Sequence, residues 1–309
     1  MHRTIHLLLH RDGADHPDLP AAIDAVQALG HRVERVVTDS AEDARTAVRR
    51  AVEARADTIV AGGGDGSFSE IATALARMQP DAGALPALGL IPMGTANDFA
   101  GAAGIPDDVV RALEVIVHCE PRPIDLLRLL ADGDEHWAVN LVSGGFGPQV
   151  TLLTDKGLKQ VFGGFAYLLT GLAKLGKIKP VSARISGEDL DWQGDFIALG
   201  VGNGRQAGGG RMLCPDALVD DGLLDVTIIP ELEGEIATTV KTLISDGRFA
   251  ALDQVATRRR MASVDIVSAD AIILNLDGEP VEARTWRIEC VPGRLYMHLP
   301  DDCPLLAGD

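Results

Sequence analysis

The chain is poor in cysteine, with four in 309 residues. No two of them have the Cys-x-x-Cys spacing of a zinc or redox site. Scattered cysteines of this kind are typical of reduced thiols, so we expect a cytoplasmic protein without zinc fingers.

Long apolar runs are also absent. No stretch reaches the roughly 18 apolar residues that span a bilayer. The N-terminal run, Ile5 and Leu7–Leu9, is interrupted by His6 and is too short for a secretory signal. We therefore expect any membrane contact to be peripheral.

Basic residues are few, with 28 Lys and Arg against 45 Asp and Glu and a formal net charge of −17. A strongly acidic chain repels nucleic acid at long range. Because no basic tail is present either, we expect no nucleic-acid partner.

Glycine, by contrast, is plentiful, and residues 62–66 read Gly-Gly-Gly-Asp-Gly directly after an apolar strand, Thr58–Ala61. Glycines at a strand-to-helix turn let the backbone approach a phosphate and direct N–H groups at it. Asp65 would repel phosphate unless a metal ion stood between them. The segment therefore indicates a nucleotide held with a divalent cation.

Two familiar nucleotide motifs do not fit this loop. It has no Gly-Lys-Ser/Thr of a P-loop, and Ser67 stands where a dinucleotide fingerprint has its third glycine. The alternative is a purely structural turn, with Ser67 as helix N-cap and Glu70 as its capping-box partner.

A second loop repeats the pattern. Gly94, Thr95, Asn97 and Asp98 follow the apolar strand Ala87–Ile91 and precede a helix. The polar residues are plausible caps, but two such loops, each with an aspartate, favour a binding site.

The first 120 residues alternate strands and helices, which predicts a doubly wound parallel sheet, an α/β domain over 1–122. Ligands bind such sheets at the carboxyl ends of strands, where both glycine loops lie. The expected strands are 4–10, 31–38, 58–61 and 87–91, with helices at 19–29, from Ser40, 67–78, 95–102 and 107–117.

After Pro121 the pattern becomes β-rich, and we expect an antiparallel sandwich domain over 123–300. The expected strands are 124–130, 136–142, 181–186, 195–202, 223–229, 264–267, 271–276, 285–291 and 295–299, with helices at 161–175 and 235–245.

Two further segments carry carboxylates. The glycine-rich run 202–210 leads to the acidic run 214–225, which suits a hard cation but in isolation reads as a solvated loop with a turn at Asp221-Gly222. Asp277-Gly278 is a strong hairpin signal, and Glu279 in isolation reads as an exposed carboxylate.

Together the four segments resemble the diacylglycerol-kinase catalytic family, most closely its bacterial YegS-like branch. The resemblance covers essentially the whole chain, whereas the first loop alone would also fit NAD kinases and phosphofructokinases. The matching motifs are Gly63–Ser67, Gly94–Ala100, Gly202–Gly210 with Leu213–Pro215, Asp277–Pro280 and Asp302–Leu306.

The resemblance implies a two-domain lipid kinase with ATP in the cleft and a tail, 301–309, that returns to the first domain. Ser67 replaces the more common threonine and keeps the hydroxyl. The positions that match ATP contacts are Thr38, Gly64, Asp65, Gly66, Ser67, Phe68, Ser69, Glu70 and Thr95.

The resemblance also implies roles for carboxylates. Glu279 matches the proton acceptor, and Asp65 and Asp98 match acids that organise the active site. The matching metal positions, for Mg²⁺ or Ca²⁺, are Leu218 and Leu223 through carbonyl oxygens and Asp221.

The implied activity is ATP- and Mg²⁺-dependent transfer of the γ-phosphate to a lipid hydroxyl. The YegS-like branch suggests phosphatidylglycerol as acceptor, and the wider family suggests diacylglycerol. A kinase of a soluble metabolite and a nucleotide-binding regulator without turnover are the alternatives. The sequence gives no oligomeric state.

Residues 151–180 carry five lysines against one aspartate, a local charge of +4, together with many apolar residues. A basic, apolar helix can lie on an anionic membrane, which would bring a cytoplasmic protein transiently to the inner membrane surface. A helix packed on the β-rich domain is the equal alternative. A second basic cluster, Arg258–Arg260, reads as a solvated strand end.

Overall fold

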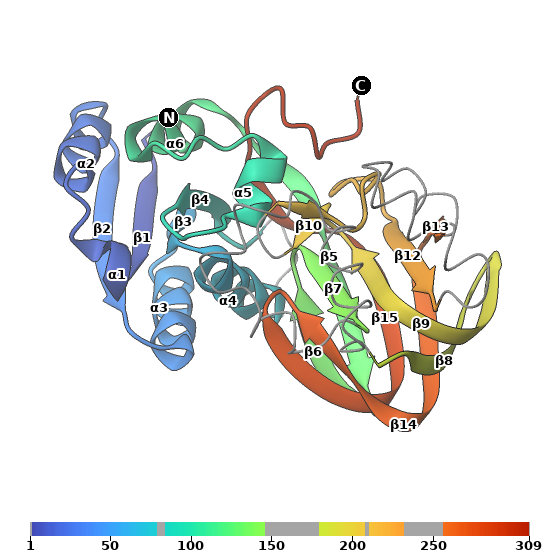
Figure 1. The fold of residues 1–309 in the computed structure, drawn as a ribbon. Helices are drawn as coiled ribbons and strands as arrows, with labels where there is room; N and C mark the ends of the chain where they lie inside the picture. The colour runs from blue at the N-terminus through green and yellow to red at the C-terminus, as the bar shows by residue number, and fades with distance from the viewer. Residues whose placement is uncertain (1, 79–83, 146–178, 208–209, 232–255, 309) are drawn as a thin grey trace, which may run out of the picture.

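The computed structural model describes residues 2–78, 84–145, 179–207, 210–231 and 256–308. The expected helices at 161–175 and 235–245 and nearly all of the basic segment 151–180 lie outside the described residues. Figure 1 shows the two halves, with the helical half running from blue to green and the strand-rich half from green to red.

The N-terminal half is a parallel sheet of β1 (Thr4–His10), β2 (Arg32–Thr38), β3 (Thr58–Gly63) and β4 (Ala87–Pro92). The spatial order is β2-β1-β3-β4, and each pair is parallel. Every residue of β3 and β4 is buried, as expected for strands covered on both faces.

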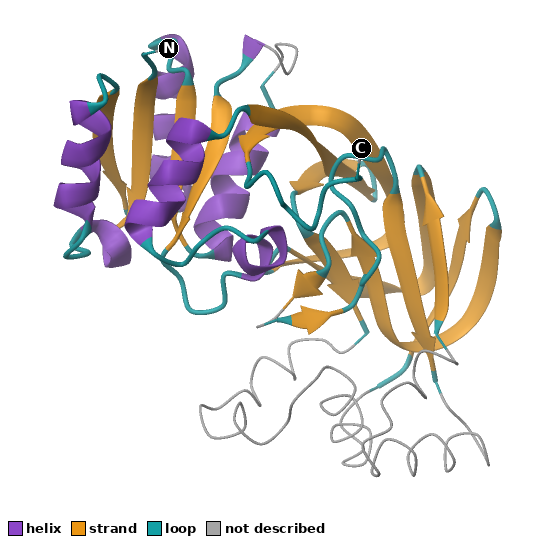
Figure 2. Ribbon diagram, turned by 90° about the horizontal axis from the view of Figure 1, so that it is seen from above, coloured by secondary structure: helices purple, strands orange, loops and turns teal. Residues whose placement is uncertain are grey.

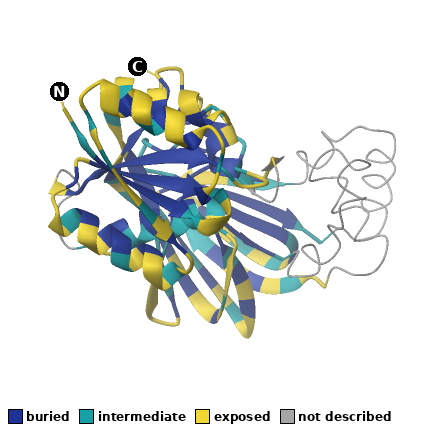
Figure 3. Cartoon of the chain, turned by 90° about the vertical axis from the view of Figure 1, so that its left-hand side faces the viewer, coloured by how far each residue is buried: buried dark blue, intermediate teal, exposed yellow. Residues whose placement is uncertain are grey.

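Helices cover both faces of this sheet (Figure 3). α2 (Leu19–Ala28) packs with α6 (Val109–His118), and α3 (Ala41–Glu53) packs with α4 (Asp65–Ala76). α3 begins where expected, because the Ser40 hydroxyl accepts the Asp43 N–H at 3.2 Å. The short helices α1 (Arg11–Ala14) and α5 (Asp98–Ala103) follow β1 and β4.

The second half is built from antiparallel pairs and long bent strands (Figure 2). β7 and β8 each pair with both β9 and β14. The long strands β9 and β14 therefore each pair with two shorter strands, at different positions along their length. Its elements are β5 (Pro121–Ala131), β6 (Asp134–Ala138), β7 (Leu141–Gly144), β8 (Val181–Gly187), β9 (Leu190–Gly202), β10 (Gln206–Ala207), β11 (Arg211–Met212), β12 (Leu224–Pro230), β13 (Thr257–Met261), β14 (Ser263–Leu276) and β15 (Glu279–His298).

β15 joins the two halves. It pairs with β14 and β5 in the second half, and its end pairs in parallel with β4 at Met297↔Leu88. Ten of the described strands therefore form one hydrogen-bonded path from β2 to β13, with β5, β6 and β8 paired beside it, while β10 and β11 form a separate pair. Leu126 belongs to the first hydrophobic core and Leu127 to the second, because successive residues of β5 face opposite sides.

The residues after β15 lie against the first core, where Cys303 and Leu305 are buried. The tail also contacts the acidic segment. The Val219 N–H donates to the Leu305 carbonyl at 2.9 Å, and the Ala307 N–H donates to Asp220 Oδ1 at 2.7 Å.

Several expected strands have different limits. The single strand expected over 136–142 is two strands, β6 and β7, because the chain breaks its pairing at Val139 and Asn140. The short strands expected over 264–276 and 285–299 merge into β14 and β15, each with a shift in register where turn residues had suggested an end. Bulges allow a strand to bend there without ending.

The expected cap of the first glycine loop is wrong. α4 begins at Asp65 with Gly64 as N-cap and no side-chain cap hydrogen bond, so Ser67 and Glu70 form no capping box. α5 begins at Asp98, not at Thr95, and Asn97, one of the expected caps, occupies its N-cap position. Asn97, at φ 52°, makes no side-chain cap hydrogen bond, because its side-chain oxygen accepts the Gly94 N–H at 2.9 Å and closes the loop.

Candidate active site

The two glycine loops meet at the carboxyl ends of β3 and β4. A Cβ built on Gly94 would lie 2.4 Å from the Gly64 Cα, and one on Gly64 would lie 3.1 Å from the Gly94 Cα. The Met93 N–H donates to the Gly63 carbonyl at 2.8 Å. Side chains do not fit between these backbones, so the loops form a narrow edge of peptide groups at the N-terminus of α4. Such an edge favours a phosphate.

Asp65 ties the first loop to the second. Its Oδ1 accepts the Phe99 N–H at 3.2 Å, at the N-terminus of α5, and the rings of Phe68 and Phe99 pack with centroids 4.7 Å apart. Phe68 is fully buried, so its side chain belongs to the core, and only its backbone can serve the ATP contact implied for it.

Asp98 brings in the third segment. Its carboxylate is buried, and its Oδ1 accepts the Gly210 N–H at 2.5 Å. The glycine-rich run after β9 therefore reaches the same edge as the loops after β3 and β4.

The fourth segment, which begins at Asp277, forms the tip of the hairpin between β14 and β15. Leu276 pairs with Glu279, so Asp277 and Gly278 form a two-residue turn with φ of 50° and 112°. These angles are those of a type I′ turn, for which Asp-Gly is a preferred pair. The Ser69 hydroxyl of α4 donates to Asp277 Oδ2 at 3.0 Å, which fixes the tip of the hairpin against α4.

Glu70 and Glu279 face one another across this contact. Burial, followed by the negative charge of Glu279, raises the pKa of Glu70, while Arg45 and His10 oppose the shift. Glu279 is exposed, as the isolated hairpin predicted, and its charge acts on Glu70 of α4.

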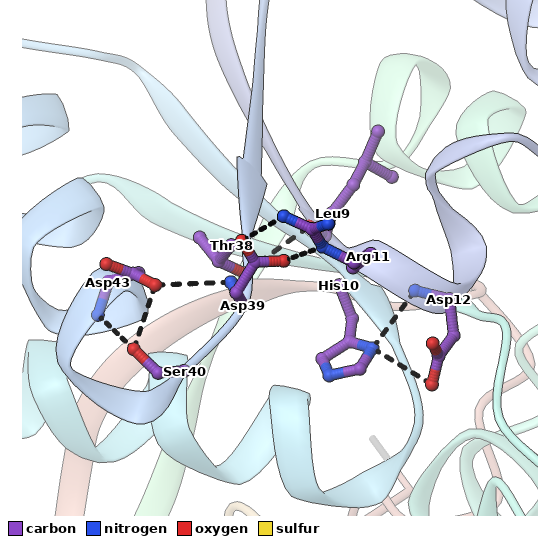
Figure 4. Close-up of polar contacts among 8 residues, drawn as sticks. All are labelled: Leu9, His10, Arg11, Asp12, Thr38, Asp39, Ser40 and Asp43. Atoms are coloured by element: carbon purple, nitrogen blue, oxygen red, sulfur yellow. Dashed lines mark hydrogen bonds and ion pairs between the residues drawn. The ribbon is translucent and has the colours of Figure 1, made fainter.

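The ends of β1 and β2 form the outer part of this edge (Figure 4). Thr38 is buried, and its hydroxyl donates to the Leu9 carbonyl at 3.3 Å. β1 lies between β2 and β3, so Thr38 is two strands from Gly64. Arg11 forms a two-contact ion pair with Asp39.

His10 lies closer to the first loop and was not anticipated. A Cβ on Gly63 would lie 3.4 Å from the His10 Cβ and 2.6 Å from the Ser67 hydroxyl oxygen. The signal was present in the sequence, because His10 ends the first strand at the same edge of the sheet. Thr95 is exposed in the second loop.

The residues matched to a metal lie in a separate loop. Asp221 Oδ1 accepts the Leu223 N–H at 3.0 Å, and its Oδ2 forms an ion pair with the Arg260 guanidinium. The loop is held by Asp125, whose carboxylate accepts the Gly222 N–H at 2.7 Å. Arg258–Arg260, read from sequence as a solvated strand end, thus contributes Arg260 to this loop.

This arrangement does not fit a divalent cation at Asp221. Carbonyl and carboxylate oxygens are the right ligands for a hard cation, but both oxygens of Asp221 are already engaged. Arg260 also lies 3.4 Å from Asp225, where burial and the charge of Asp216 raise the pKa to about 7. Among the described residues, no three His, Cys, Asp or Glu side chains gather as metal ligands. The metal assignment of Leu218, Asp221 and Leu223 stays a prediction.

The described part of the chain contains no helix with the length and apolar character needed to cross a bilayer.

Comparison with known proteins identifies both halves. Residues 12–129 match the family model of the diacylglycerol kinase catalytic domain, and residues 140–298 match that of the YegS C-terminal NAD kinase beta sandwich-like domain. The fold and these matches define the chain as a kinase with a catalytic part and a β-sandwich part. It belongs to the diacylglycerol kinase catalytic family, in the YegS-like branch, as its motifs predicted.

Similar proteins extend over nearly the whole chain. The chain is 55% identical to a "Probable lipid kinase YegS-like" of Stenotrophomonas maltophilia (strain K279a), over 98% of both chains. It is 43% identical to one of Pseudomonas aeruginosa (strain PAO1), over 97% of this chain and 95% of that protein. A crystal structure of a diacylglycerol kinase from Bacillus anthracis str. Sterne has a TM-score of 0.70 at 18% identity, over 97% of each chain, which supports the fold.

Proposed function

We propose that the protein transfers the γ-phosphate of ATP to a lipid hydroxyl in a Mg²⁺-dependent reaction, with phosphatidylglycerol as the acceptor and diacylglycerol as the alternative. One observation carries the proposal. Three distant segments, with Asp65, Asp98 and the hairpin of Glu279, converge on the edge where Gly64 and Gly94 meet. The names of the similar proteins support a lipid acceptor.

The place where the Gly64 and Gly94 backbones meet, which we call the glycine edge, would hold the phosphates of ATP. Backbone N–H groups of both loops and the N-terminus of α4 offer donors and a partial positive charge to an anion. The segment Gly64–Glu70, with Thr38 and Thr95, would provide the nucleotide contacts.

Asp65 and Asp98 would hold the Mg²⁺ that accompanies ATP. When bound, Mg²⁺ neutralises charge on the transferring phosphoryl group. The chain's own carboxylates are placed to carry it, because both lie at the first turns of helices that begin at the glycine edge.

Glu279 would accept the proton of the lipid hydroxyl. A carboxylate with a reference pKa near 4.3 is a weak base for an alcohol. It therefore takes the proton late, when the oxygen has begun to bond to phosphorus, as a loose phosphoryl-transfer transition state allows. The enzyme would meet its lipid peripherally, at the inner surface of the membrane.

The test is transfer of labelled γ-phosphate from ATP, with and without Mg²⁺, in mixed micelles of phosphatidylglycerol, in micelles of diacylglycerol and in a lipid-free control. We expect label in one lipid and a loss of about 100-fold or more in Glu279→Gln, with ATP binding retained. Glu282→Gln is the matched control, because Glu282 is an exposed carboxylate of the same strand.

Near wild-type turnover in Glu279→Gln would remove that residue from the role. Absence of labelled lipid, with ATP bound, would point to a soluble acceptor or to a regulator without turnover.

A further inference from the structure

Asp277 stands at the tip of the β14–β15 hairpin in a backbone conformation that few side chains adopt, with φ of 50°. Aspartate tolerates this region better than most residues, but some strain remains. The surrounding contacts must hold it in place.

Those contacts are four donors around one carboxylate. Three consecutive backbone N–H groups donate to it, from Val139 at 2.7 Å, Asn140 at 3.1 Å and Leu141 at 2.8 Å. Val139 and Asn140 lie between β6 and β7, and Leu141 is the first residue of β7. The fourth donor is the Ser69 hydroxyl.

The carboxylate therefore joins three parts of the molecule: α4, the peptide between β6 and β7, and the hairpin. Ser69 precedes Glu70 in α4, and Asp277 lies two positions before Glu279. The backbone donors fix the hairpin within the second half. Of these four donors, the Ser69 hydroxyl alone comes from the first half.

We propose that Asp277 is a positioning residue and that the Ser69–Asp277 hydrogen bond couples α4 to the hairpin that carries Glu279. The sequence places Ser69 among the ATP contacts, whereas its hydroxyl is directed at Asp277. The catalytic meaning of this coupling rests on the proposed function, but the coupling itself does not.

Kinetics of Ser69→Ala separate the two roles of the hydroxyl. The variant loses one hydrogen bond and keeps the three backbone donors. We expect kcat to fall about tenfold with the KM for ATP within about twofold, because a misplaced base slows the chemical step more than nucleotide binding. Thr73→Ala is the matched control, since the Thr73 hydroxyl bonds within the same helix, to the Glu70 carbonyl, and should behave as wild type.

A raised KM for ATP with unchanged kcat in Ser69→Ala would assign the hydroxyl to the nucleotide and overturn the proposal. So would equal effects of Ser69→Ala and Thr73→Ala.

Hydrogen–deuterium exchange reads the coupling without any lipid. Loss of the Ser69 contact should speed exchange at the hairpin tip 276–279, so Ser69→Ala should exchange faster there than the wild type and Thr73→Ala. Equal exchange in the two variants would contradict the coupling. If the wild type phosphorylates no lipid, the proposed function fails, and this comparison still decides the inference.

A double-mutant cycle completes the test. Asp277→Ala removes the acceptor of the Ser69 hydroxyl. Adding Ser69→Ala to it should cost no further activity, because the partner is already lost. If Asp277→Ala does not fold, the comparison of Ser69→Ala with Thr73→Ala stands alone.

Discussion

Two acidic regions of the molecule handle charge differently. At the glycine edge, Asp65 accepts a neutral backbone N–H from Phe99. In the loop before β12, Asp221 and Asp225 both lie against the Arg260 guanidinium. The first region positions a carboxylate without cancelling its charge, and the second brings its own cation.

The difference indicates what each region can bind. A carboxylate held by an amide remains attractive to Mg²⁺, whereas one held by a guanidinium must lose that partner before it accepts another cation. The glycine edge is therefore the better place for the ion of the proposed reaction, although the family resemblance implies a metal in the loop before β12.

The largest expected effect concerns Asp65. Asp65→Asn keeps an acceptor for the Phe99 N–H but removes the charge, and we expect kcat to fall by about 100- to 1,000-fold. Lipid-phosphorylation kinetics measure it. Asp12→Asn, at an exposed position of α1, makes the same charge change as a control. Equal activity of the two variants would end the distinction between the regions.

A smaller effect is expected at His298, the last residue of β15, where this strand joins the two halves. Burial lowers the pKa of His298 to about 4, and the neutral ring donates through Nδ1 to the Cys119 carbonyl at 2.8 Å and accepts the Thr58 hydroxyl at 3.2 Å. Because the folded pKa is below the unfolded value of 6.5, its contribution is present above pH 6.5 and lost as pH falls toward 4. We expect about 3 kcal/mol of acid destabilisation from this group.

Urea unfolding between pH 4 and 7 measures this effect. His298→Gln should flatten the pH dependence of the free energy of unfolding, whereas the exposed-site variant His16→Gln should keep the wild-type slope. An unchanged slope in His298→Gln would show that the seam does not depend on a neutral imidazole.

The smallest expected effect concerns Arg260. If the guanidinium competes with a cation for Asp221, Arg260→Ala should bind Ca²⁺ or Mg²⁺ about tenfold more tightly, because one positive charge has left the loop. Calorimetric titration of each ion measures it, with Arg259→Ala as the control. No measurable binding in either protein would mean that the loop holds no cation even without Arg260, whereas equal affinities would show that Arg260 does not compete for Asp221.

The sequence predicted those parts of the fold that depend on local pattern. β1 has the expected limits, and α3 starts at the expected cap. The glycine loops were found because strand, glycine and helix follow one another directly. Helix starts failed at Ser67 and Thr95, where the close contact of the Gly64 and Gly94 backbones sets where each helix begins.

The candidate site was predictable as a list of segments but not as a geometry. Asp277 reads as a turn residue, and nothing local indicates that Ser69, 208 positions earlier, donates to it. Likewise, Arg260 meets Asp221 only because β13 pairs with β12. Long-range pairing decides which carboxylates keep their charge, and a single sequence does not reveal it.

The seam at β15 has a consequence for how the chain folds. The edge of β4 at Leu88 pairs with Met297, and the ribosome adds Met297 209 residues after Leu88. The pairing therefore cannot form until nearly the whole chain has been made. Until then the N-terminal half has an unpaired parallel edge, the kind of surface that invites association with other chains. The high contact order of this pairing should make its closure a slow, late step, so aggregation during synthesis would be most sensitive to changes at the very end of β15.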